Sequence, residues 1–232
     1  MKKISFMFLY LCIICAVYGQ SVTIHKGLRS ITVEKPDSVV FHPQKQVEYL
    51  DNTTGTLDGH DWVQLWENGP KWATMNVGAM FIEDYGDYFQ WGAGSFVYEF
   101  TTQCYKVNKD IQGTSYDMAT ATWGDNWCLP TSQDLSDLLN SDNTIKTMTT
   151  QNGYFGLLVK GRGHYSSNSV FLPAAGNIVF GVKKDLGEDC FYWCSTSYSS
   201  VNAFHIWCYK TYINIYFNGK EYGQSVRAIV KE

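Results

Sequence analysis

The residues of this sequence best suited to chemistry lie near its C-terminus, and their types point to binding. Between Cys194 and Tyr222 there are eight aromatic side chains and only three charged ones, and Ser, Thr, Asn and His fill most other positions. Tyr and Trp supply a large contact area at a low cost in conformational entropy, while Ser and Asn supply adaptable hydrogen bonds. This composition predicts a ligand-binding segment at about 194–222.

Two short strands, at 203–206 and 213–215, are expected to carry this segment. Their expected core positions are Ala203, Ile206, Cys208, Ile213 and Ile215. The expected ligand contacts are the polar and aromatic side chains around them: Tyr198, Asn202, His205, Trp207, Tyr209, Tyr212, Asn214 and Tyr216. Among these, Trp207, Tyr209 and Tyr212 are the expected hot spots, since aromatic anchors dominate many interfaces. The alternative is an aromatic strand pair that only covers the core, but eight rings exceed what one buried face of two short strands can absorb.

Acidic and histidine residues could instead indicate metal or acid–base chemistry, but their spacing does not favour it. Glu83, Asp84 and Asp87 surround Gly86, which is typical of a turn. The five histidines are dispersed and form no His-x-His or His-Glu-x-x-His motif. We therefore expect no catalytic residue, no metal and no cofactor, and the chain is not expected to be an enzyme.

The N-terminus has the pattern of a secretory signal peptide over 1–19. Lys2 and Lys3 precede an apolar run that is too short to span a bilayer, and no later run is long enough to do so. A lipoprotein leader cleaved before Cys15 is the competing interpretation, but Ile14 is too large for that cleavage motif. The chain is therefore expected to be exported to the extracellular space or outer cell surface, with the periplasm as the alternative.

Five cysteines lie beyond the predicted signal peptide, which is an odd number for an exported chain. They are Cys104, Cys128, Cys190, Cys194 and Cys208. Each has apolar or aromatic neighbours, which favours small buried hydrophobic side chains. Cys190 and Cys194 lack a second close pair or nearby histidines, so a zinc site is not indicated. One disulfide is compatible with this set, and the sequence does not select the pair.

The net charge of the chain bears on its partners, and the positions of Gly and Pro indicate how it is divided. Residues 1–19 hold two of the 18 basic residues and none of the 22 acidic ones, so the remainder carries a net charge of −6. A mildly acidic chain without Lys/Arg clusters is not expected to bind nucleic acid. Short alternating runs broken by Gly and Pro predict a β-rich lead at 20–57, followed by one main domain at 58–232.

Helical signals are few, so the main domain is expected to be α+β, rich in strands and loops, with one or two helices. Thr131 or Ser132 can cap a helix in which Leu135, Leu138 and Leu139 follow at helical spacing. A shorter helix is expected at 117–122.

Seven motifs stand in a fixed order along the main domain. They are WATMNVG at 72–78, EDYGDYFQWG at 83–92, YDMAT at 116–120, WGDNWCLPT at 123–131, FLPAAG at 171–176, YWCST at 192–196 and SVR at 225–227. Over 58–232 the chain resembles the Fibrobacter succinogenes major paralogous domain family of exported gut-bacterial proteins. Seven ordered motifs are far more specific than one.

The resemblance implies a C-type-lectin-like fold, related to formylglycine-generating enzymes and to bacterial and phage variable receptors. In relatives whose genes are diversified by retroelements, adenine-directed mutation falls on this C-terminal segment. Nearly all the expected contact residues can be reached from Asn codons by changing adenines, with Trp207 as the exception. The Glu-Pro-Asn and Gln-Pro-Asp signatures of calcium-dependent lectins are absent from the sequence, which argues against calcium-mediated sugar binding.

The motif residues themselves are expected to hold the scaffold. Trp72, Trp91, Trp123, Trp127 and Trp193 are the expected anchors. Arg227 lies between Val226 and Ala228 and is expected in a buried ion pair or on loop carbonyls.

The sequence thus predicts an exported surface recognition protein that binds a protein or a glycan through its aromatic C-terminal segment, of undetermined oligomeric state. One rival is a formylglycine-generating-type enzyme, which needs a redox-active or copper-binding pair among Cys190, Cys194 and Cys208; the recognisable active-site pair of those enzymes is absent. Another is a structural subunit or tip adhesin of a surface appendage, with 20–57 supplying a donor strand.

Overall fold

The computed structural model describes residues 16–18, 21–26, 29–34, 52–94 and 107–231. The chain divides into two compact units, 1–48 and 49–232, each of which makes most of its contacts within itself. The first unit holds one antiparallel sheet of strands β1 (Ala16–Tyr18), β2 (Ser21–Lys26) and β3 (Arg29–Glu34). Strands β2 and β3 lie within the lead that is expected to be β-rich at 20–57, whereas its residues 35–51 lie outside the described part of the chain.

The described residues of the second unit form four small sheets, and the first of them joins distant parts of the chain. Its strand order is β4-β5-β6-β18-β8, all antiparallel. These strands are β4 (Thr54–Leu57), β5 (His60–Gln64), β6 (Lys71–Ala73), β18 (Ile229–Val230) and β8 (Trp127–Cys128). Ile229 pairs with Trp72 on one side and with Cys128 on the other, so the last strand lies inside the sheet.

Three further sheets are found among the described residues of the second unit. One has the order β13-β12-β17-β7, with β7 (Phe89–Gln90), β12 (Asn177–Val179), β13 (Val182–Lys184) and β17 (Gly223–Gln224). The next has the order β11-β10-β9, with β9 (Thr144–Gln151), β10 (Tyr154–Gly161) and β11 (Ser169–Pro173). The last has the order β14-β15-β16, with β14 (Asp189–Ser197), β15 (Asn202–Tyr209) and β16 (Tyr212–Gly219).

Two α-helices lie among these sheets, at the places that the local signals predict. In α1 (Met118–Trp123), the N-cap Asp117 accepts hydrogen bonds from two backbone N–H groups of the first turn. In α2 (Ser132–Leu139), Thr131 is the N-cap and forms a reciprocal capping box with Asp134. A short 3₁₀ helix, η1 (Gly163–Tyr165), follows β10. The unit is thus strand-dominated with two α-helices in its described residues, which confirms the α+β, strand-rich class.

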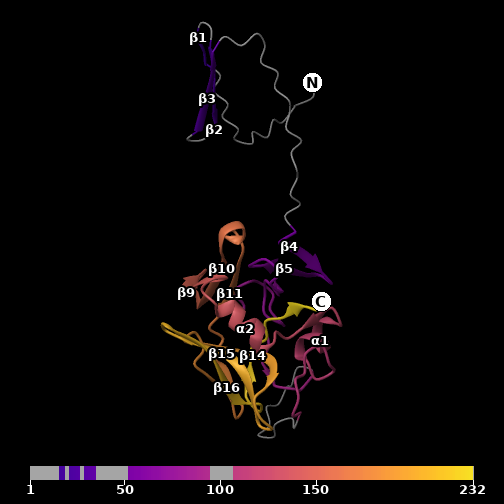
Figure 1. Ribbon diagram of the computed structural model, residues 1–232. Helices are drawn as coiled ribbons and strands as arrows, with labels where there is room; N and C mark the ends of the chain where they lie inside the picture. The colour runs from indigo at the N-terminus through magenta and orange to yellow at the C-terminus, as the bar shows by residue number, and fades with distance from the viewer. Residues whose placement is uncertain (1–15, 19–20, 27–28, 35–51, 95–106, 232) are drawn as a thin grey trace, which may run out of the picture. The chain divides into compact units, whose positions relative to one another are not determined.

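Helix α2 determines which face of the β14–β16 sheet is buried. It contacts β9 of one three-stranded sheet and all three strands of the other, and Figure 1 shows it between them. Its Leu135 and Leu138 pack in one core cluster with residues of β14 and β15, including Tyr192 and Ile206. One face of the β14–β16 sheet therefore belongs to the core.

Tryptophan residues anchor both core clusters. Trp72, Trp91, Trp127 and Trp193 are all fully buried, as the motifs predict. Trp123 is half-buried, because its ring lies on the surface stacked against His60 at 3.7 Å between centroids. It is the one expected anchor that is not part of the buried core.

Arg227 is buried in the second unit and is held by carbonyl oxygens. Its guanidinium donates twice to the Asn76 side-chain oxygen, at 2.8 and 3.0 Å. It also donates to the main-chain oxygens of Ala73, Thr74 and Phe171, at 2.7–3.1 Å. Of the two environments expected for Arg227, the structure is nearer to main-chain carbonyls, but only Thr74 lies in a loop, because Ala73 belongs to β6 and Phe171 to β11.

Candidate functional site

Side chains of the β14–β16 sheet alternate between its two faces, because successive residues of a strand point to opposite sides. The face under α2 carries Cys190, Tyr192, Ile206 and Cys208, all buried in the core. Ile213 and Ile215 of β16 pack against the same cluster, and Ala203 is buried in the second cluster. The five expected core positions of this segment are thus confirmed.

The opposite face carries six of the eight expected contact residues. In the β15–β16 register, His205 faces Tyr216, Trp207 faces Asn214 and Tyr209 faces Tyr212. Residues directly opposite each other in an antiparallel pair lie on the same face of the sheet. We call His205, Trp207, Tyr209, Tyr212, Asn214 and Tyr216 the aromatic face.

Exposure is uneven across the aromatic face. Tyr212 and Tyr216 are 42% and 49% exposed, and Asn214 is also exposed. Trp207 and Tyr209 are half-buried. All five side chains are therefore accessible to a ligand.

His205 differs from the other members, because it is only 2% exposed. Its ring stacks on Phe191 at 5.7 Å and lies 5.8 Å from the Trp193 ring. The pKa of His205 is lowered to about 4, because the effect of burial outweighs the opposing effect of the neighbouring Gln224 amide. In this structure His205 supports the aromatic face from below and is not accessible to a ligand.

Tyr198 and Asn202 do not belong to the aromatic face. Asn202 begins β15 and pairs with Gly219, so it has the parity of the core-facing positions. Tyr198 lies in the loop before β15, is 51% exposed and stacks on Phe217 at 4.1 Å. These two residues lie beside the end of the sheet, apart from the other six.

Trp207 is the centre of the aromatic face and is held in one orientation. Its ring lies 5.1 Å from Tyr212 and 6.4 Å from Tyr216, and it stacks on Phe191 at 6.4 Å. Its indole N–H donates to a carboxylate oxygen of Asp189 at 2.8 Å. A ring held on several sides loses little conformational freedom when a ligand binds it.

Two further residues support Trp207 and were not expected from the sequence. Phe191 and Asp189 lie on β14, opposite Trp207 and Tyr209, and therefore on the same side of the sheet. Burial raises the pKa of Asp189, while the hydrogen bond from Trp207 opposes that rise. The period-two pattern of β14 alone could have indicated their common face, but only the register places them beneath Trp207.

Lys220, directly after β16, ties together the loops at the end of the sheet. Its side chain is buried, and its ammonium group donates to the main-chain oxygens of Val107 and Ser199, both at 2.7 Å, and to the Ser197 hydroxyl at 2.9 Å. The same group lies 4.3 Å from the centre of the Trp91 ring. One side chain thereby connects the loop before β15 with the segment at 107.

A Lys220→Met variant is expected to be about 2–4 kcal/mol less stable than the wild type in chemical denaturation, because several buried acceptors lose a charged donor. Lys160→Met is the matched control, since Lys160 is exposed on β10. Equal denaturation midpoints for the two variants would show that the buried ammonium contributes nothing.

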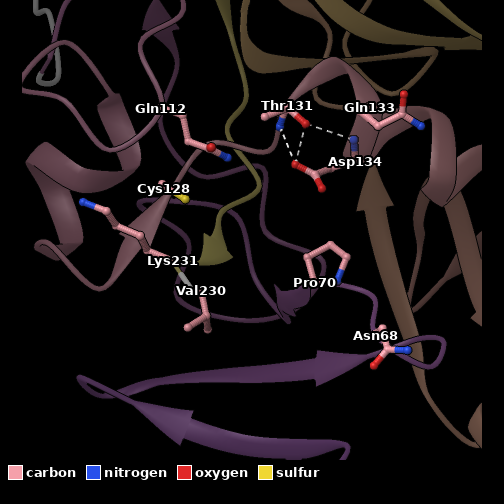
Figure 2. Close-up of a pocket in the computed structure, with 9 residues that line it drawn as sticks. All are labelled: Asn68, Pro70, Gln112, Cys128, Thr131, Gln133, Asp134, Val230 and Lys231. Carbon is pink, nitrogen blue, oxygen red and sulfur yellow. Dashed lines mark hydrogen bonds between the residues drawn. The ribbon is translucent and has the colours of Figure 1, made fainter.

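A separate pocket of about 420 Å³ lies beside the N-terminus of α2 (Figure 2). It is lined by Asn68, Pro70, Gln112, Cys128, Thr131, Gln133, Asp134, Val230 and Lys231. Figure 2 shows Thr131 and Asp134 joined by the hydrogen bonds of the capping box, at 2.7–3.1 Å. Gln112 donates to the Leu129 main-chain oxygen at 2.9 Å. Several of its polar groups are therefore engaged within the fold.

Cys128 is the candidate nucleophile among the residues that line this pocket, but its thiol is poorly suited to that role. Burial raises the pKa of Cys128 to about 12, and the thiolate is the reactive form of cysteine. The same cause raises the pKa of Cys194 to about 12. Both thiols are therefore protonated at neutral pH.

The acidic residues of the second motif shape a turn. Asp84 accepts from the main-chain N–H of Met80 at 3.0 Å. Gly86 has a φ of 66°, and a Cβ there would lie 2.4 Å from the Val77 main-chain oxygen. Glu83 accepts from Gln151 at 2.6 Å, and this bond holds the pKa of Glu83 below its usual value. The turn expected from these residues lies at 81–84 and includes Glu83 and Asp84, whereas Gly86 and Asp87 follow it.

Comparison with known proteins adds no relative to this geometry. No protein-family model, no curated protein and no solved structure matches the chain. In the described part of the chain, no group of three or more His, Cys, Asp or Glu residues is arranged to hold a metal ion. None of its helices has the length and apolar character needed to cross a membrane.

Proposed function

We propose that this chain is an exported surface recognition protein that binds a protein or glycan ligand through the aromatic face, without a metal ion. The proposal includes membership of the Fibrobacter succinogenes major paralogous domain family and its C-type-lectin-like fold, which the seven ordered motifs support. The observation that carries the function is the β15–β16 register, which gathers six expected contact residues, five of them accessible, on one side of a sheet.

The chemistry of the aromatic face supports recognition. Exposed Tyr212 and Tyr216 flank Asn214 on β16, and the Asn214 amide donates to the Tyr212 hydroxyl at 3.2 Å. Aromatic rings beside an amide give apolar contact and hydrogen bonding within one patch, a combination typical of paratopes. The raised pKa values of Cys194 and Cys208 do not favour the rival enzyme, which needs a redox-active or copper-binding pair among Cys190, Cys194 and Cys208.

Diversification by a retroelement is part of this proposal, and the strand pattern of β16 is compatible with it. Exposed Tyr212, Asn214 and Tyr216 alternate with core-facing Ile213 and Ile215, so the former can vary while the latter maintain the packing. A near-identical DNA repeat that differs only at adenines, beside a reverse transcriptase gene, would support diversification. Its absence from the locus would leave an invariant binding surface.

Binding is expected to fail when Trp207 is removed. A Trp207→Ala variant should bind at least roughly 30-fold more weakly, about 2 kcal/mol, because central aromatic anchors dominate binding energy. The probes are an array of immobilised oligosaccharides and a second array of folded surface proteins, each tested with the full chain. Circular dichroism must show that the variant remains folded.

Substitutions at two more exposed tyrosines test binding with less risk of unfolding the protein. Tyr212→Ala removes a ring that is 42% exposed on the aromatic face, and Tyr116→Ala removes one that is 43% exposed elsewhere. We expect only the first to weaken binding. Equal binding of both variants and the wild type on every probe that gives a signal would overturn the proposal, and unfolding of Trp207→Ala would assign that ring to the core.

A further inference from the structure

Two cysteines face each other across the β14–β15 hairpin. Cys190 is the direct register partner of Cys208, and both side chains are fully buried on the face that α2 covers. Opposed residues of antiparallel strands have Cα atoms about 4.5–5.5 Å apart. Disulfides span Cα separations of about 4.4–6.8 Å. The separation typical of such an opposed pair therefore lies within the range that a disulfide spans.

The other two cysteines of the described chain have different surroundings. Cys194 lies where the β14–β15 register is interrupted between Trp193 and Ser197, and its thiol donates to the Phe204 main-chain oxygen at 3.3 Å. Cys128 lies on β8, in another sheet, opposite Ile229. Among these four residues, only Cys190 and Cys208 are directly opposed on neighbouring strands.

We infer that Cys190 and Cys208 form a cross-strand disulfide when the chain folds in an oxidising environment. Two S–H bonds break and one S–S bond forms. The two electrons and two protons pass to the disulfide of an oxidant such as oxidised glutathione, which leaves as two thiols. The inference selects one pair from a set of cysteines whose sequence favours none.

Burial dictates when this bond forms. Hydrogen bonding to Cys190 and burial hold the pKa of Cys208 well above its usual range. Because thiol–disulfide exchange proceeds through the thiolate, the closed sheet reacts slowly. The bond therefore forms while β14 and β15 pair, before α2 covers them.

The disulfide would lie directly behind the aromatic face. The next register pair, Phe191 and Trp207, points to the opposite side of the sheet. Joining the strands at the adjacent position would hold these two rings in place, which lowers the entropic cost of binding. The bond itself does not depend on the existence of a ligand.

The test begins with the full chain, unfolded and reduced, then refolded in a mixture of reduced and oxidised glutathione. Free thiols are alkylated in denaturant, and chymotrypsin is used because aromatic residues separate Cys190, Cys194 and Cys208. Mass spectrometry should find the peptides of Cys190 and Cys208 joined, and Cys194 alkylated. Recovery of Cys190 and Cys208 as alkylated thiols, or joined to other cysteines, would overturn the inference.

Thermal denaturation gives a second readout. The oxidised protein is expected to melt roughly 5–10 °C above the reduced protein, as is typical for closing a loop of this length in a domain of this size. Cys190→Ala and Cys208→Ala should each abolish this difference. Cys194→Ala, which changes an equally buried cysteine of the same strand, should retain it. Loss of the difference in Cys194→Ala, or its persistence in Cys190→Ala, would assign the bond to another pair.

Discussion

An Arg227→Met variant is expected to lose about 3–5 kcal/mol of unfolding free energy, the largest effect of any single substitution considered for this chain. Methionine fills much of the volume but donates no hydrogen bond. The Asn76 side chain and the main-chain oxygens of Ala73, Thr74 and Phe171 would each lose a donor. Buried acceptors that are left unpaired cost about 1–3 kcal/mol each.

The effect should reach beyond Arg227 because its partners belong to a wider network. Asn76 also donates to the Tyr192 hydroxyl at 3.1 Å, and Tyr192 donates to the Pro173 main-chain oxygen at 2.8 Å. Tyr192 lies on β14, on the core side of the sheet that carries the aromatic face. Losing Arg227 should therefore loosen the support of that face as well.

Urea denaturation of matched variants measures this effect. Arg162→Met makes the same substitution at an exposed arginine and should leave the midpoint almost unchanged. Arg227→Lys should fall between the wild type and Arg227→Met, since one ammonium cannot reach all the acceptors of a guanidinium. If Arg227→Met and Arg162→Met unfold at the same urea concentration, the carbonyl site does not stabilise the fold.

Acid should destabilise the wild type more than a His205→Gln variant, by about 2 kcal/mol between pH 7.5 and 4.5. Burial lowers the pKa of His205 from 6.5 to about 4. The folded state therefore binds fewer protons than the unfolded state between these values. The contribution of the neutral His205 side chain to stability is fully present above pH 6.5 and is lost as the pH falls towards 4.

The surroundings of His205 make this effect specific. Phe191, Trp193 and Gln224 lie next to the His205 ring, and none of them carries a charge that could stabilise an imidazolium. His164→Gln is the control, because His164 is exposed. Unfolding free energies at the two pH values should fall equally in the wild type and the control. An equal fall in His205→Gln would mean that other groups cause the acid sensitivity.

Local patterns predicted the elements of this fold well, because they depend on neighbours in the chain. Thr131 and the spacing of Leu135 and Leu138 were sufficient to predict α2. The alternation of residues 203–216 was sufficient to predict which isoleucines of β16 face the core. Capping and strand periodicity require no knowledge of distant segments.

Residues that depend on distant segments were harder to predict. His205 has the same alternation as Trp207, but Trp193 of β14 lies against its ring and buries it. Phe191 supports Trp207 only because β14 and β15 pair in one particular register. Such neighbours come from the arrangement of the strands, which periodicity within a single strand does not specify.

The position of β18 has a consequence for the timing of folding. Ile229 must bridge Trp72 and Cys128 before the first sheet of the second unit is continuous. Until Ile229 has been synthesised, the strands β4, β5 and β6 therefore cannot be joined to β8. Contacts between such distant positions also slow the search for the native state. The second unit should consequently mature only after synthesis has passed Ile229, and until then β8 lacks its partner in the sheet.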